Sequence, residues 1–407
     1  MTSLAQQTLF LPFENGILPP PDDGARVLAF GIEADTALDD AWKKALTIIQ
    51  PLRPDYLKLE RAGFHAVPRL ETAETSAQGT PLWPAGHLPL KGGDYAFRDV
   101  RHQSQTLRDE DGELCQPISP LEGEMPGRAE GGVPPLHRAI DRFDAGLMLL
   151  GKHRGRNEQW FADLLASVAP GGWIVVCGDK KLGIDSFRKW AEKVVPAEDR
   201  LSKNHAVAFW MKRPADLPDD VIEMLRPAAK RVDGRFHTAP GMFSHGEIDK
   251  GSALLAHHLE GRLRGAVADF GAGWGYLSAE CLKYPEKIER IDLYEADFEA
   301  LEAARGNLAS LAGNVPLSFH WQDLVSEPVA GIYDTIVMNP PFHEGRAADV
   351  SLGQAFIAVA ARRLKPGGRL LLVANRQLPY EATLKPLFRS VETLEEGQGF
   401  KVIEAKR

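Results

Sequence analysis

The stretch "GAVADFGAGWGYLS" (residues 265–278) decides the fold class of the second half of the chain. Its apolar start predicts a buried strand, and the residues after Gly275 predict a helix. Between them, Gly271, Gly273 and Gly275 allow a tight turn and a close approach of the backbone to a ligand. A strand, a glycine turn and a helix in this order form the opening unit of a doubly wound α/β sheet.

The residues after this stretch continue the alternation of strands and helices. We expect strands at 290–297, 315–323, 333–339 and 368–375, helices at 297–313 and 351–364, and a closing hairpin at 390–406. Alternating elements of this kind imply a mostly parallel sheet with helices on both faces. The hairpin adds an antiparallel edge to that sheet.

Size and composition limit the possible classes of protein. A chain of 407 residues suggests about two domains, and its net charge of -8 argues against nonspecific coating of nucleic acid. Cys115, Cys177 and Cys281 have neither metal-site nor disulfide-framework spacing, so we expect a reducing compartment and no metal. The N-terminus lacks the pattern of a signal peptide, and no apolar run is long enough to cross a bilayer. We therefore expect a cytoplasmic protein without a membrane partner.

Two segments of the chain share one pattern. An Asp opens a short apolar strand at Asp144 and again at Asp334, and a helix, a Pro-Gly-Gly turn and a buried strand follow each. We interpret this as an internal duplication, although any two βαβ units share part of the pattern. The predicted division is a degenerate domain at 1–213 with an irregular insert at about 101–137, a linker at 214–234 and a catalytic domain at 235–407.

The spacing of the glycines favours one cofactor over another. Dinucleotide sites require a third glycine where this chain has Tyr276, whereas the pattern here, after an acidic residue, suits S-adenosylmethionine. We expect Asp269 to bind the ammonium group of that cofactor, and Glu295, at the end of the next strand, to accept hydrogen bonds from ribose hydroxyls. Asp323 could accept from the adenine amino group, with the backbone N–H of Leu324 facing the ring. A solvated strand end for Glu295 and a helix cap for Asp323 remain alternatives.

The stretch "NPPF" (residues 339–342) ends a predicted strand, because neither proline can donate to a sheet. The side-chain oxygen of Asn339 and the carbonyl of Pro340 are two acceptors that could hold the hydrogens of an exocyclic amino group. Phe342 could stack on the base that carries this group. The pattern indicates methylation of an amino nitrogen. A proline-rich strand terminator with Phe342 in the core is the alternative.

These motifs make the second half resemble the class I S-adenosylmethionine-dependent methyltransferases. With "APGMFSHGEIDKGSALL", "GFKVIEAKR" and "SKNHAVAFWMK", the whole chain resembles the bacterial ribosomal RNA small-subunit guanine-N2 methyltransferases that act on guanine 1207 of 16S rRNA. The resemblance implies two tandem Rossmann-like methyltransferase domains, of which only the second binds cofactor. It also implies that Phe243 to Gly246 and Asp249 to Ser252 lie beside cofactor and substrate, and that His343 lies near the base. The implied partner is 16S rRNA, within the small subunit or an assembly intermediate.

The first half lacks the residues that this chemistry requires. When the two halves are aligned, the positions of Asn339 to Phe342 are occupied in the first half by Leu149, Leu150, Gly151 and Lys152. Of the glycine loop, only Gly31 remains. We therefore expect this half neither to bind cofactor nor to methylate. We expect it to chaperone folding and to dock RNA through the phosphate contacts of four cations, unless these simply form a solvated face. The cations are Lys152, Arg154, Lys180 and Lys181.

Other functions remain open from the sequence. The "NPPF" motif fixes the type of atom that is methylated better than the molecule. A 23S rRNA guanine, DNA adenine or a protein glutamine amide are alternative substrates, and a noncatalytic rRNA-binding assembly factor is an alternative of another class. The set of Asp269, Glu295 and Asn339 favours an enzyme over the assembly factor.

Overall fold

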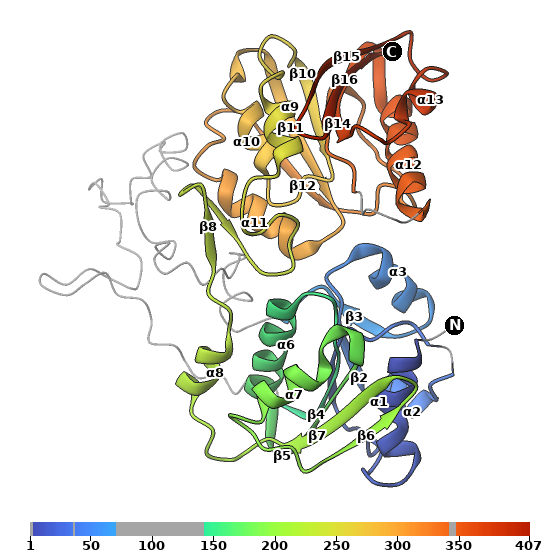
Figure 1. Ribbon diagram of the computed structural model, residues 1–407, viewed down its shortest axis with the longest axis vertical. Helices are drawn as coiled ribbons and strands as arrows, with labels where there is room; N and C mark the ends of the chain where they lie inside the picture. The colour runs from blue at the N-terminus through green and yellow to red at the C-terminus, as the bar shows by residue number, and fades with distance from the viewer. Residues whose placement is uncertain (1–2, 36, 71–141, 342–346) are drawn as a thin grey trace, which may run out of the picture. The chain divides into compact units, whose positions relative to one another are not determined.

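The computed structural model describes residues 3–35, 37–70, 142–341 and 347–407, with only the backbone for 347–349. The predicted insert at about 101–137, Phe342 and His343 lie outside the described residues. The chain from residue 1 to 70 and from 142 to 407 forms one compact unit. Within it are two seven-stranded sheets, each with helices against it (Figure 1).

The first sheet has the strand order β3-β2-β1-β4-β5-β7-β6. Its strands are β1 (Val27–Phe30), β2 (Leu46–Ile49), β3 (His65–Val67), β4 (Phe143–Leu149), β5 (Val168–Asp179), β6 (Asp199–Lys203) and β7 (Ala206–Lys212). Its helices are α1 (Leu4–Glu14), α2 (Asp40–Ala45), α3 (Arg53–Arg61), α6 (Arg154–Ser167) and α7 (Ile184–Ala191), with a 3-10 turn η1 (Lys180–Leu182). The strands pair in parallel except for β7, which is antiparallel to both of its neighbours.

The second sheet has the order β12-β11-β10-β13-β14-β16-β15. Its strands are β10 (Gly265–Phe270), β11 (Ile288–Glu295), β12 (Leu317–Trp321), β13 (Tyr333–Met338), β14 (Leu364–Asn375), β15 (Ser390–Gly397) and β16 (Phe400–Lys406). Its helices are α9 (Lys250–Ala256), α10 (Tyr276–Cys281), α11 (Phe298–Leu308), α12 (Ala347–Arg363) and α13 (Tyr380–Leu384), with a 3-10 turn η2 (Pro285–Lys287). The doubly wound, mostly parallel sheet and its closing antiparallel hairpin are confirmed.

The two sheets have the same topology, strand for strand, as an internal duplication predicts. Their registers also agree, since Phe30 pairs with Met148 in the first sheet and Phe270 with Met338 in the second. Leu149, the residue after Met148, therefore stands where Asn339 stands. This equivalence agrees with the alignment of the two halves from sequence.

Short elements join the two sheets. They are α8 (Asp219–Leu225), β8 (Lys230–Val232) and β9 (Phe236–Thr238), and β8 and β9 form a two-stranded hairpin. The segment 214–234, which we expected to be a linker, thus contains a helix and a strand. The division into 1–213, 214–234 and 235–407 stays a prediction.

The central strands of the second sheet are buried along their length. Val267, Ala268 and Phe270 of β10 are fully buried, as are Ile336 and Met338 of β13. Because both strands are parallel and adjacent, the glycine turn after β10 and the prolines after β13 leave the sheet at the same edge. None of the helices in the described part of the chain has the length and apolarity that crossing a membrane requires.

Candidate active site

The glycine turn after β10 depends on left-handed backbone conformations. Gly271, Gly273 and Gly275 have φ values of +78°, +54° and +90°, a region that L side chains rarely adopt. A Cβ on Gly275 would also lie 3.1 Å from the Cβ of Ala304 on α11. Gly271 N–H donates to the Tyr294 carbonyl at 2.9 Å, which fixes the turn against β11. A Cβ on Gly273 would meet no atom within 4 Å, so the backbone of the turn is open to a close approach at this residue.

Asp269 is fully buried just before this turn. Its Oδ2 accepts a hydrogen bond from the Ser278 hydroxyl at 2.7 Å, and its Oδ1 has no partner among the described residues. Burial, chiefly, raises the pKa of Asp269 to about 7, and the charge of Glu295 adds to this rise. A buried carboxylate with a free oxygen is costly unless a donor or a cation meets it. This arrangement fits an ammonium group at the turn.

Glu295 ends β11 and supports the glycine turn from the other side. Its Oε2 accepts from Gly273 N–H at 2.7 Å, and its Oε1 accepts from Asp297 N–H at 2.9 Å. Burial raises the pKa of Glu295, although these backbone hydrogen bonds partly offset the rise. Because a carboxylate has about four acceptor sites, Glu295 keeps capacity for ribose hydroxyls.

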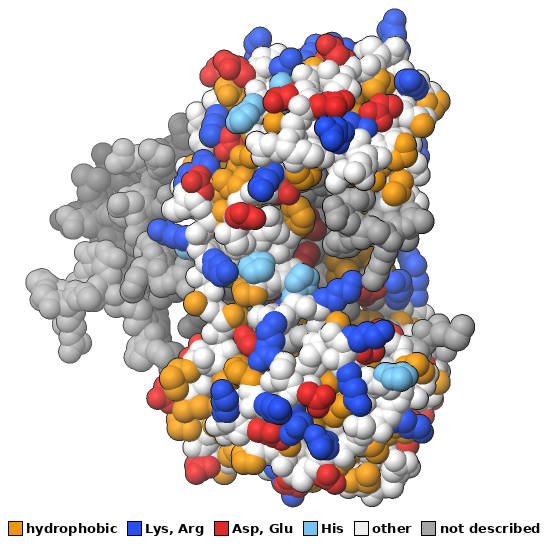
Figure 2. All heavy atoms as spheres, viewed as in Figure 1, with side chains coloured by type: hydrophobic (Ala, Val, Ile, Leu, Met, Phe, Trp, Pro, Cys, Tyr) orange, Lys and Arg blue, Asp and Glu red, His pale blue; other side chains and the backbone are white. Residues whose placement is uncertain are grey.

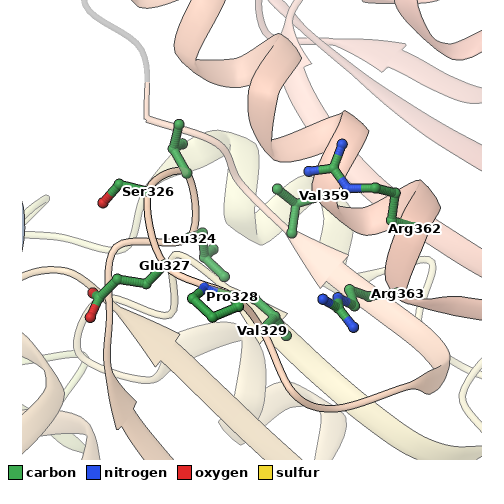
Figure 3. Close-up of a pocket in the computed structure, with 9 residues that line it drawn as sticks. Leu324, Ser326, Glu327, Pro328, Val329, Val359, Arg362 and Arg363 are labelled. Atoms are coloured by element: carbon green, nitrogen blue, oxygen red, sulfur yellow. The ribbon is translucent and has the colours of Figure 1, made fainter.

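Asp323 caps the turn that follows β12. Its Oδ1 accepts from Val325 N–H at 3.1 Å, and its Oδ2 accepts from the Ser326 hydroxyl at 2.5 Å. Leu324 is buried and lines a pocket between the 324–329 loop and α12 (Figure 3). Neither residue lines the pocket that contains Asn339. The structure therefore gives Asp323 a turn-capping role and leaves its expected contact with adenine a prediction.

Asn339 lies directly after β13, and its amide has a defined orientation. The Nδ2 group donates to Asp249 Oδ2 and to Ser252 Oγ, both at 2.9 Å. Asp249 is itself the N-cap of α9, and its Oδ2 also accepts from Ser252 N–H at 2.7 Å. Since both amide hydrogens are used, Oδ1 is the acceptor end of the side chain, and it has no hydrogen-bond partner among the described residues. Pro340 follows and is buried.

One pocket contains both the glycine turn and Asn339, whereas Asp269 and Glu295 do not line it. It is lined by Phe243, Ser244, Asp249, Ser252, Gly271, Ala272, Gly273, Trp274, Tyr276, Leu277 and Asn339. Phe243 is 59% exposed although it is a large aromatic residue, and its carbonyl accepts from the Trp274 indole N–H at 2.9 Å. An exposed ring on a fixed backbone is suited to stacking on a base.

The four cations that we expected to contact RNA differ in their local interactions. Lys152, Lys180 and Lys181 are exposed and form no ion pair within the described part of the chain. Arg154 instead pairs with Glu158 at 2.6 Å and lies over the Phe187 ring at 5.0 Å. Figure 2 shows Lys and Arg side chains mixed with acidic ones over the face that carries α6 and α7. Their contact with RNA stays a prediction.

Sequence reasoning missed several residues that shape the site. Ser278 binds Asp269, and Asn307 of α11 donates to the Trp274 carbonyl at 2.9 Å and to the His237 carbonyl at 3.0 Å. The buried polar side chain of Asn307 thus ties the glycine loop to β9. Its position in an amphipathic helix gave no signal for this. Within the described residues, no group of three or more His, Cys, Asp or Glu could hold a metal ion.

Comparison with known proteins identifies the relatives of this chain. Residues 233–404 match the model of the methyltransferase small domain. The chain is 32% identical to the ribosomal RNA small subunit methyltransferase C of Pseudomonas paraeruginosa over 294 residues, which is 70% of this chain and 85% of that protein. It is 31% identical to the protein of the same name from Psychromonas ingrahamii, over 64% of this chain and 75% of that protein.

A solved structure shares the overall fold of this chain. It is the T. thermophilus 16S rRNA N2 G1207 methyltransferase in complex with AdoMet and guanosine, with a TM-score of 0.66 and 20% identity. The similarity covers 100% of this chain and 92% of that one. The two sheets, the motif set around Asn339 and the identity to these relatives lead to one conclusion. The chain belongs to the ribosomal RNA small subunit methyltransferase C family.

Proposed function

We propose that this protein transfers a methyl group from S-adenosylmethionine to the exocyclic N2 of a guanine in 16S rRNA, at the position equivalent to guanine 1207. The observation that carries the proposal is the orientation of Asn339. Its amide hydrogens are bound by Asp249 and Ser252, so it presents an acceptor beside the glycine turn. The exocyclic amino group of guanine donates hydrogen bonds, so it requires an acceptor of this kind.

The residues of the glycine turn fit the cofactor. The unpaired Oδ1 of Asp269 suits its ammonium group, and Glu295 suits the ribose hydroxyls. Asp323 and Leu324, on the next loop, would meet the adenine. When bound, S-adenosylmethionine supplies an electrophilic methyl group on a sulfonium. The family of this chain and the structural relative from T. thermophilus, which was solved in complex with AdoMet, support the same assignment.

Positioning provides much of the catalysis, because the lone pair of an aryl amine is delocalised and reacts poorly. Asn339 Oδ1 and the Pro340 carbonyl accept the two N2 hydrogens and direct the lone pair out of the base plane. The same acceptors would stabilise the positive charge that grows on N2 as the new N–C bond forms and the methyl–sulfur bond breaks, which leaves a neutral thioether, and the extra proton of N2 would then pass to water. Phe342 would stack on the base, and the exposed ring of Phe243 offers a second apolar surface beside it. His343 would lie near the base.

The substrate partner follows from the reaction. We propose 16S rRNA within the small ribosomal subunit or an assembly intermediate, with Lys152, Arg154, Lys180 and Lys181 of the first half contacting phosphates. Such contacts position RNA without reading its sequence. Because ribosomal RNA matures in the bacterial cytoplasm, the proposal implies a cytoplasmic enzyme.

The test uses labelled S-adenosylmethionine with separate substrates: naked 16S rRNA, 30S subunits, 23S rRNA and DNA. We expect label in 16S rRNA, at N2 of one guanine when the modified nucleotide is mapped. Label that maps to an adenine amino group or to 23S rRNA would reject the assignment of the substrate. Absence of transfer to any of them, with cofactor bound, would reject the reaction.

A further inference from the structure

The loop after β2 in the first half joins the loop after β11 in the second half. Phe298 N–H donates to the Pro51 carbonyl at 2.9 Å, and Arg53 N–H donates to the Ala296 carbonyl at 2.8 Å. Leu52 pairs with Asp297 as an antiparallel bridge between these two bonds. The sheet registers make the two loops equivalent, since Phe30 pairs with Ile49 and Phe270 with Tyr294. The duplicated halves therefore meet through the same element on each side.

Arg53 extends this junction to the loop after β12. Its Nη2 lies 2.8 Å from Glu327 Oε1, its Nε lies 3.0 Å from Glu327 Oε2, and both side chains are only 21% exposed. Glu327 Oε2 also accepts from the backbone N–H of Asp323 at 2.8 Å. The guanidinium of Arg53 lies over the Trp321 ring at 4.7 Å, and the Trp321 indole donates to the Pro51 carbonyl at 3.0 Å. One arginine thus connects the first half to Asp323.

Arg156 of α6 makes the corresponding connection to the loop after β11. Its Nη2 lies 2.7 Å from Asp297 Oδ2 and 3.2 Å from Glu299 Oε2. Asp297 in turn donates its N–H to Glu295 Oε1. The Arg156 side chain is 14% exposed, so its charge offsets two carboxylates that water screens weakly.

We propose that Arg53 and Arg156 are positioning residues for cofactor binding. They hold the loops that carry Glu295 and Asp323 in the geometry that receives the ribose and the adenine. The proposal rests on the proposed function, because it assumes that S-adenosylmethionine binds at these loops. It gives the first half a role at the cofactor site although that half contributes no cofactor ligand.

The physical reason is the cost of leaving partly buried carboxylates unpaired. Without Arg53, Glu327 loses three hydrogen bonds and turns towards water, which removes its support for the Asp323 backbone. Without Arg156, Asp297 and Glu299 repel each other beside Glu295. A small displacement of these loops weakens every contact that depends on their geometry.

The experiment measures the affinity of the full-length protein for S-adenosylmethionine by calorimetry. We expect Arg53→Ala and Arg156→Ala each to raise the Kd about tenfold. Arg53→Lys, which keeps the charge but not the fork of donors, should fall between the wild type and Arg53→Ala. In methylation assays the KM for cofactor should rise by the same factor. The kcat at saturating cofactor should change less than about twofold, because Asn339 is oriented by Asp249 and Ser252 of the second half.

Arg188→Ala is the matched control. Arg188 of α7 pairs with Glu192 at 2.5 Å with exposures of 15% and 30%, and within the described residues neither side chain forms a hydrogen bond or ion pair with the cofactor loops. Its Kd should stay within about twofold of the wild type even if its melting temperature falls as much as that of Arg53→Ala. A Kd unchanged in both loop variants, or raised equally in the control, overturns the proposal. If Arg53→Ala fails to fold, Arg53→Lys replaces it in this comparison, and an unchanged Kd in Arg53→Lys counts against the proposal. A wild-type protein that does not bind S-adenosylmethionine instead rejects the proposed function.

Discussion

The orientation of one amide decides what the site can accept. Asp249 and Ser252 bind both hydrogens of Asn339 Nδ2, so the side chain offers its oxygen as an acceptor. The residue type alone does not determine which end of the Asn amide faces the site, because its donor end and its acceptor end have similar shapes. A carboxylate at Asp249 removes this ambiguity, since it accepts hydrogen bonds and cannot donate them when ionised.

Asn339→Ala should lower kcat by about 10² or more, because it removes one of two acceptors that stabilise charge on the reacting nitrogen. The Kd for S-adenosylmethionine should change little. Single-turnover transfer of labelled methyl and calorimetry measure the two effects. Asn375→Ala is the control, since Asn375 also ends a strand, β14, but within the described residues its side chain binds only Gln377 N–H. Wild-type transfer rates in Asn339→Ala would contradict the mechanism.

Asp269 should make cofactor binding depend on pH. Its folded pKa of about 7 lies above the value of about 3.9 in an unfolded chain. The folded protein therefore holds an extra proton between these values, and the contribution of Asp269 to stability falls as pH rises through that window. A bound ammonium favours the ionised carboxylate.

We expect the affinity for S-adenosylmethionine to increase between about pH 6 and about pH 8, with a proton released on binding. Calorimetry in buffers of different ionisation enthalpy measures that proton. Asp269→Asn should bind weakly and without this pH dependence. Asp334→Asn should behave as the wild type, because the Lys365 ammonium and other donors hold the pKa of Asp334 below its usual value despite partial burial. A flat pH profile in the wild type would exclude Asp269 as the titrating group.

At the scale of elements, the glycine turn and the helix after it form one packed unit. The close approach of the turn to α11 requires Gly275, whose missing side chain leaves room for Ala304. The hydrogen bonds of Asn307 to Trp274 and His237 then fix α11 to the turn and to β9. The geometry of the glycine turn therefore depends on the helix that packs against it.

Gly275→Ala should lower the free energy of unfolding by about 1–2 kcal/mol for its left-handed backbone and by about 1–3 kcal/mol more for the contact with Ala304. Gly313→Ala is the matched control. Gly313 has a φ of +55° with open space around it, so only the first cost applies. Urea denaturation of both variants gives the difference. Equal losses would show that the contact with α11 does not constrain the turn.

At the scale of the whole molecule, the two halves share a topology and differ in chemistry. The register places Leu149 at the position of Asn339 and Ala29 at the position of Asp269. Ile49 and Tyr294 occupy equivalent positions, so Gln50, the residue after Ile49, occupies the position of Glu295. The first half thus lacks the acids and the acceptor at these positions, and its inability to bind cofactor or to methylate stays a prediction.

Replacing Lys152, Lys180 and Lys181 with Glu should weaken binding of 16S rRNA while the Kd for S-adenosylmethionine stays the same. Each lost phosphate contact should also reduce the slope of log K against log salt by about 0.7 for a single-stranded site. Arg154 is left unchanged because it is paired with Glu158. Lys230, Lys287 and Lys385, also exposed, provide a triple-Glu control with the same change in net charge. Equal RNA affinity in the two triple variants would remove the proposed docking role.

The sequence by itself determined the doubly wound fold, the duplication and the order of Asp269, Glu295 and Asn339. These features are local, since they follow from strand and helix patterns, glycine spacing and residues at strand ends. The tertiary structure decided which way the Asn339 amide points and that Arg53 and Arg156 reach the loops after β12 and β11. Residues 53 and 327 lie far apart in the chain. Arg and Glu are also common on protein surfaces, so nothing in the sequence marks these two as a pair. Only the folded arrangement brings such residues together, because the contact arises from the packing of two sheets and not from any local pattern.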